Sequence, residues 1–183
     1  MKPVARMSLA EFAAYVSSHL RKHGIRAVLS GGACVSIYTG NRYQSYDLDF
    51  VENVPSSRKR LQEVLSAMGF TESDRCFKHP DTDFFLDFLA GPLAVGNEPV
   101  HHTAELTLPT GTLVLLSPTD CVKDRLAAYY HWGDKQCLEQ ALLVTQNAAV
   151  DIRDIRRWSA GEGKLAEFER IRSKFLEARR KRE

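Results

Sequence analysis

The sequence has no long hydrophobic run, and this absence excludes one class of protein. Among its 183 residues, no apolar stretch approaches the ~18 residues that a membrane-spanning helix requires. The charged start of the chain, from Met1 to Arg6, is followed by no apolar stretch either, so we expect no signal peptide. We therefore predict a cytoplasmic protein with no membrane partner.

Cysteine is scarce, and internal repeats and low-complexity segments are absent. The four cysteines are scattered and lack the paired spacing of a metal site (Cys34, Cys76, Cys121 and Cys137). In a cytoplasmic chain, reduced thiols are expected. The formal net charge is only +2 and favours no class of partner. The 44% hydrophobic and 26% charged residues are ordinary for a globular protein with a core.

What the sequence does contain is a series of periodic segments. Ser8 and Glu11 form a capping-box pattern, and apolar residues then recur every three or four positions up to Gly24, which predicts a helix. Residues 33–38 and the segment around 61–68 are predicted helices as well. Strands are predicted at 27–30, 46–52 and 84–89, hairpins over 70–78 and 103–116, and a loop over 91–99. Because residues 84–89 are nearly all apolar, we expect that strand to be central and covered on both faces.

The character of the chain changes at Ser117. Ser117 and Pro118 form a strong helix start, and nothing beyond them resembles a strand. Helices are predicted near 118–131, 135–147, 152–160 and 163–181. The fold class is therefore α+β, with a mixed sheet flanked by helices. We predict a core over residues 1–116 and a C-terminal helical region, 117–183, packed on that core.

The most informative pattern combines two glycines with three acids. Gly31 and Gly32 end an apolar strand, where they allow the backbone to approach a ligand closely. Asp47 and Asp49 stand two residues apart on a strand, so their side chains point to one face about 6.5 Å apart. Asp87 lies in another apolar strand. Such carboxylates suit hard cations, although surface acids and a ligand-free turn at the glycines are the simpler alternatives.

These residues resemble the DNA polymerase beta-like nucleotidyltransferase superfamily, and within it the AbiEii/MenT-type bacterial toxins. The resemblance covers roughly residues 8 to 145 and rests on Ser30-Gly31-Gly32, Asn41 to Phe50, and Leu86-Asp87-Phe88. It implies a minimal nucleotidyltransferase core that uses NTP with Mg²⁺ or Mn²⁺. The three acids, Asp47, Asp49 and Asp87, would be both catalytic and metal-binding residues. The implied nucleotide contacts are Gly31, Gly32, Arg42, Lys123 and Arg125.

The late helices depart from that pattern. Arg125 stands where the group usually has a lysine, and Cys137 stands where it usually has an aspartate. The resemblance implies transfer of a nucleoside monophosphate to RNA, such as a tRNA 3′ end, or to a protein, by a toxin with an antitoxin partner. The alternatives are an antibiotic-type enzyme with a small-molecule acceptor and a catalytically inactive binding module.

Two features near the C-terminus each allow two interpretations. The basic residues from Arg179 to Arg182 form either a solvated helix end or a contact for nucleic-acid phosphate. The aromatic run from Tyr129 to Trp132 either packs in the core or stacks on a nucleobase. Ile152, Ile155 and Trp158, by contrast, have the spacing of a buried helix face.

Overall fold

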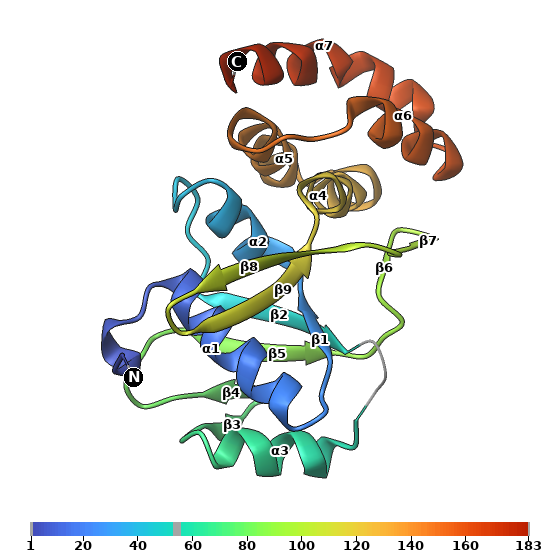
Figure 1. Ribbon diagram of the computed structural model, residues 1–183. Coiled ribbons are helices and arrows are strands. Elements are labelled where there is room, and N and C mark those ends of the chain that lie inside the picture. Colours follow the sequence, from blue (N-terminus) through green and yellow to red (C-terminus); the bar gives the residue numbers. More distant parts are fainter. Residues whose placement is uncertain (1, 53–55, 183) are drawn as a thin grey trace.

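The chain folds into a main sheet with helices packed on it, and its last helices, between Pro118 and Arg182, are stacked beyond one edge of that sheet (Figure 1). The computed structural model describes residues 2–52 and 56–182. The seven-stranded mixed sheet has the order β3-β4-β5-β2-β1-β9-β8. Its strands are β1 Ala27–Leu29, β2 Asp47–Glu52, β3 Thr71–Ser73, β4 Cys76–Lys78, β5 Phe85–Leu89, β8 Thr103–Leu108 and β9 Gly111–Leu116.

Several of the helices begin at a residue whose side chain caps the first turn. The helices are η1 Val4–Arg6, α1 Leu9–Lys22, α2 Gly31–Tyr38, α3 Arg58–Ser66, α4 Pro118–Trp132, α5 Lys135–Asn147, α6 Ile152–Gly161 and α7 Leu165–Arg182. Ser8 and Glu11 form the expected capping box of α1, and the Ser117 hydroxyl accepts a hydrogen bond from the amide of Asp120 at the start of α4. These caps satisfy amide groups that the first turn of a helix leaves without a partner.

One face of the sheet carries the core. Leu48, Phe50 and Leu86 are completely buried on the face opposite the acids of β2 and β5. Arg58 of α3 lies over the ring of Phe77 on that same face, 4.7 Å from its centroid. The helices α4 to α7 lie above the edge of the sheet, with α4 nearest to it and α7 farthest away (Figure 1).

The α+β fold class and the C-terminal helices are confirmed, but β5 differs from the prediction. Although β5 is nearly all apolar, it is not covered on both faces, because Leu89 is 45% exposed and Phe85 and Asp87 are only half-buried. The apolar run therefore supports burial on one face alone. The other face is open beside Asp87.

A second correction concerns residues 91–99, which contain a short hairpin rather than only a loop. Its strands are β6 Ala94–Val95 and β7 Glu98–Pro99. The indole Nε1–H of the buried Trp158 donates to the carbonyl oxygen of Val95 at 3.1 Å, so the hairpin packs on α6. Trp158 lies in the core as its spacing predicts. Across residues 2–52 and 56–182, no helix has both the length and the apolar character that crossing a bilayer demands.

Gly111, the first residue of β9, provides a test of this packing. A Cβ atom there would lie 2.7 Å from the carbonyl oxygen of Ala14 and 2.4 Å from the Ser18 hydroxyl, with φ at +148°. We expect Gly111→Ala to lower the free energy of unfolding by about 1–3 kcal/mol, because α1 must shift. Chemical denaturation measures this. Gly161→Ala, where a Cβ meets nothing within 4 Å, is the matched control and should not destabilise. Equal stability of the two variants would contradict the packing.

Candidate active site

The pairing of β2 with β5 brings the three acids together. The two strands run parallel, and Asp49 is the direct partner of Asp87. Directly paired residues of neighbouring strands point to the same face, and so does Asp47, two residues before Asp49. The three carboxylates predicted from the sequence therefore lie on one face of the sheet.

The start of α2 lies against this acid face. The backbone amide of Ser30 donates to the carbonyl oxygen of Asp49 at 2.8 Å, which ties the beginning of the helix to β2. Gly31 has φ at +68°, and a Cβ atom there would be only 2.1 Å from Oδ2 of Asp49. Only glycine allows the backbone to pass this close to the carboxylate. The first turn of α2 thus points its positive end at the acids.

Gly32 and Arg42 lie in the same part of the molecule. A Cβ atom on Gly32 would stand 3.3 Å from the Tyr43 ring and from the Ser45 hydroxyl, so the loop that leads into β2 packs on the start of α2. Arg42 is exposed in that loop, five residues before Asp47. Nowhere in the described chain does its guanidinium form an ion pair.

Electrostatics within the acid cluster are unfavourable. Burial, followed by the charges of Asp47 and Asp87, raises the pKa of Asp49 to about 6. Burial and the charge of Asp87 also raise the pKa of Asp47. Oδ1 of Asp47 is buried without a hydrogen-bond partner. Carboxylates held together in this way favour a bound proton or a cation.

The oxygen atoms of the acid cluster are candidate ligands for a divalent cation. Carboxylate oxygens are the ligands that Mg²⁺ and Mn²⁺ prefer, and Asp47 offers a buried oxygen that no hydrogen bond satisfies. Oδ1 of Asp87, however, accepts the amide of Phe88 at 2.8 Å. In the part of the chain that the structure describes, no group of three or more His, Cys, Asp or Glu side chains is arranged to hold a metal ion. The described side chains alone therefore do not complete a metal site, and a cation at the unsatisfied oxygen of Asp47 would need further oxygens from a bound ligand.

Arg125 of α4 faces the acid cluster from the helical region. Its guanidinium pairs with Asp124 at 2.6 Å and reaches Oε1 of Gln140 on α5 at 3.5 Å. Its positive charge partly opposes the rise in the pKa of Asp49. Arg125 is thus a cation whose charge reaches the acid cluster, and its nucleotide contact stays a prediction.

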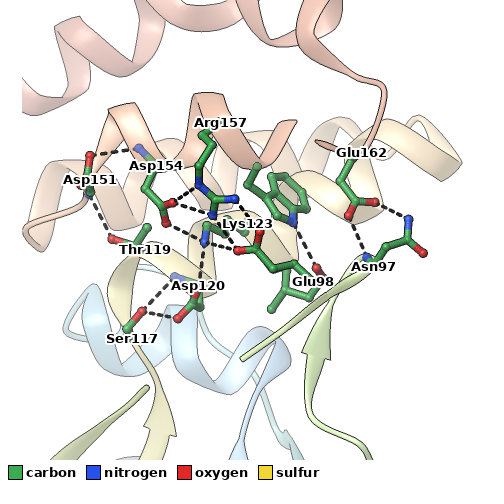
Figure 2. Close-up of polar contacts among 12 residues, drawn as sticks. Asn97, Glu98, Ser117, Thr119, Asp120, Lys123, Asp151, Asp154, Arg157 and Glu162 are labelled. Atoms are coloured by element: carbon green, nitrogen blue, oxygen red, sulfur yellow. Dashed lines mark hydrogen bonds and ion pairs between the residues drawn. The ribbon is translucent and has the colours of Figure 1, made fainter. Parts of the chain in front are cut away.

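Lys123, the other predicted cation of α4, lies elsewhere. Two residues along an α-helix correspond to about 200° of rotation, so Lys123 and Arg125 occupy opposite sides of α4. The Lys123 ammonium is bound by Asp154 at 2.7 Å, Asp120 at 3.2 Å and Glu98 at 3.3 Å (Figure 2). Its side chain is only 5% exposed. The structure therefore does not bring Lys123 to the acid face.

We call the residues around Lys123 the lysine cluster: Glu98, Asp120, Lys123, Asp154 and Arg157. Arg157 binds both Glu98 and Asp154 at 2.7 Å (Figure 2). Burial opposes the charged form of Lys123, but the carboxylates of Asp154 and Asp120 outweigh it and raise the pKa of the ammonium. The cluster joins the β6–β7 hairpin, α4 and α6. Sequence reasoning missed it because these residues lie far apart in the chain and share no motif.

Comparison with known proteins supports the fold. No family model matches the chain, and no curated protein sequence matches it significantly. Among solved structures, it is similar to an antigenic nucleotidyltransferase-like protein from Paracoccidioides brasiliensis, with a TM-score of 0.65, 14% identity, and coverage of 96% of this chain and 95% of that one.

Two structures of the antibiotic-resistance factor ANT(2'')-Ia are also similar. One, in complex with adenylyl-2''-tobramycin, has a TM-score of 0.52 at 13% identity and covers 84% of this chain and 95% of that chain. The other, a solution structure, has a TM-score of 0.51 at 14% identity and covers 92% and 94%. The chain therefore has a nucleotidyltransferase fold. At these identities the likeness concerns the fold alone.

The raised pKa of Asp49 predicts a pH-dependent stability. The pKa of its carboxyl is 3.8 in the unfolded chain and about 6 in the folded protein, so the folded state binds more protons between these values. The Asp49 carboxyl therefore contributes its full stabilisation below pH 3.8, and this contribution is lost as pH rises through 6. The loss is at most about 3 kcal/mol in the free energy of unfolding. We expect Asp49→Asn to stabilise the metal-free protein at pH 8 and much less at pH 4.

Denaturant unfolding at the two pH values measures this effect. Glu139→Gln, which removes an exposed carboxylate on α5, is the matched control and should change little at either pH. If Asp49→Asn failed to stabilise the protein at pH 8, the charge of the Asp49 carboxylate would not destabilise the folded state.

The lysine cluster predicts a large stability effect for one substitution. Lys123→Met would leave Glu98, Asp120 and Asp154 with Arg157 as the remaining cation. Breaking a buried ion pair typically costs about 3–5 kcal/mol, and we expect a loss of that order in the free energy of unfolding. Lys181→Met, at an exposed i,i+4 pair with Glu177, should change stability by less than about 0.5 kcal/mol. Similar losses in both variants would show that the cluster contributes little.

Proposed function

We propose that the protein is a nucleotidyltransferase that moves a nucleoside monophosphate from NTP to an acceptor hydroxyl with the help of Mg²⁺ or Mn²⁺. The observation that supports this most strongly is the arrangement of Asp47, Asp49 and Asp87 on one sheet face, with Gly31 at the start of α2 directly against Asp49. Carboxylates held beside a helix N-terminus suit a polyphosphate and its cation together.

In this proposal, the first turn of α2 and the Arg125 guanidinium hold the triphosphate, and the exposed Arg42 adds a contact from the loop before β2. Asp47 and Asp49 would hold the divalent cation, which when bound neutralises charge on the phosphates and stabilises charge on the transferring group. The raised pKa values of both carboxyls are consistent with residues that need a cation to ionise fully.

In the proposed transfer, one bond to phosphorus forms and another breaks. The acceptor oxygen forms a bond to the α-phosphorus of the nucleotide, and the bond from that phosphorus to the bridging oxygen breaks. Pyrophosphate leaves with the bond electrons. The proton of the acceptor hydroxyl passes to Asp87, which lies beside Asp49 on the neighbouring strand and faces the open side of β5.

For the acceptor, we propose RNA, such as a tRNA 3′ end, or a protein hydroxyl, and a cytoplasmic toxin paired with an antitoxin as the biological role. This rests on the resemblance in sequence pattern. The basic end of α7 lies on the side of the helical region away from the sheet (Figure 1). Lys181 is already paired with Glu177 at 3.2 Å. A small-molecule acceptor remains the alternative, because ANT(2'')-Ia shares the fold.

The proposal predicts the behaviour of three variants. We expect labelled NTP with Mg²⁺ to transfer its label to total RNA, to proteins of a lysate or to an aminoglycoside. Asp47→Asn, Asp49→Asn and Asp87→Asn should each reduce the rate by about 100-fold or more, since each removes charge that the transition state needs. Separating the labelled products identifies the acceptor class.

Asp81→Asn, in the loop before β5, is the matched control and should transfer at the wild-type rate, because its carboxylate is largely exposed. Folding of every variant is checked by circular dichroism. Wild-type activity in Asp87→Asn would remove that residue as the proton acceptor. Absence of transfer to all three acceptor classes would count against the proposed reaction.

A further inference from the structure

The two tryptophans of the chain lie in opposite environments. Trp158 is 2% exposed and hydrogen-bonded within the core, whereas Trp132, at the last residue of α4, is 81% exposed. In the described part of the chain, the ring contact found for Trp132 is with His131, at 6.5 Å between centroids and 67° between planes. A large aromatic face is therefore open to solvent.

The position of Trp132 on α4 relates its exposed ring to Arg125. Arg125, Tyr129 and Trp132 are spaced i, i+4 and i+7, so they lie on one side of the helix. Exposure increases along this side, from the Arg125 side chain at 17% through a half-buried Tyr129 to Trp132 at 81%. The side begins near the acid cluster, because α4 packs on α2, whose start lies against Asp49, and the charge of Arg125 reaches that carboxylate. The lysine cluster occupies the opposite side.

The separation along this side suits a nucleotide. Seven residues correspond to about 10 Å along the helix axis. In an extended nucleotide, the base lies a comparable distance from the terminal phosphates. With its triphosphate held at Arg125 and the start of α2, a nucleotide that extends along this side of α4 would place its base within reach of Trp132. An exposed indole stacks on any base, and one such contact contributes about 1–3 kcal/mol.

We infer that Trp132 is a binding residue for the base of the nucleotide whose phosphates lie at Arg125. This inference rests on the proposed function and deepens it, because it assigns a base-stacking position that is separate from the phosphate and metal contacts. It also assigns the two interpretations of the aromatic run from Tyr129 to Trp132 to different residues. Tyr130 packs in the core against Trp158, at 6.0 Å and 22°, while Trp132 provides the open surface.

The test compares a ligand that has a base with one that lacks it. ATP, GTP, CTP and UTP, and separately inorganic tripolyphosphate, are titrated with Mg²⁺ into the full chain by calorimetry. Trp132→Ala should weaken binding of the best nucleotide by about 5- to 150-fold, the range that stacking of one base corresponds to. It should leave tripolyphosphate affinity unchanged, and Trp132→Phe should restore most of the nucleotide affinity.

Tryptophan fluorescence provides a second readout. Because Trp158 is buried, nucleotide but not tripolyphosphate should change the emission of the wild type, and the change should disappear in Trp132→Ala. If Trp132→Ala binds nucleotide as tightly as the wild type, or loses tripolyphosphate to the same extent, the inference is wrong while the proposed function stands. If the wild type binds neither ligand, the proposed function fails and the inference fails with it.

Discussion

The parallel pairing of β2 with β5 is the constraint on which the rest of the site depends. Its register sets Asp49 directly beside Asp87. A shift of one residue would turn the acids of one strand into the core and expose Leu48 or Leu86, so burial of the opposite face protects the register. Beside Asp49, the start of α2 leaves no space for any residue other than glycine at position 31. Packing of the core thus maintains the carboxylates at an electrostatic cost.

The chain contains two clusters of partly buried charged residues, and they differ in whether the carboxylates have cationic partners. In the lysine cluster, three carboxylates surround Lys123, Arg157 binds two of them, and the ion pairs join the β6–β7 hairpin to α4 and α6. In the acid cluster, Asp47 keeps a buried oxygen without a partner, and the pKa of Asp49 rises to about 6. A cluster that is satisfied internally stabilises the fold, whereas one that is left incomplete is suited to a ligand.

Much of the fold followed from local patterns. The capping box at Ser8, the helix start at Ser117 and the alternating strands depend on neighbours within a few residues, and their elements appear where the sequence indicates. Two predictions failed for a physical reason. Apolar residues on β5 do not reveal whether a helix covers both faces, and the weak pattern of residues 91–99 does not reveal a hairpin held by Trp158 and the lysine cluster.

The sequence by itself determined the order of most elements, the α+β class and the presence of the acids on particular strands, because strand alternation and helix capping act over short range. Only the tertiary structure decided which of these residues meet. Lys123 and Arg125 are indistinguishable as two nearby cations in the sequence, yet α4 turns one toward Asp154 and the other toward Asp49. That outcome depends on how the helix packs between α6, α5 and the sheet, and packing between distant segments leaves no local signal in the chain.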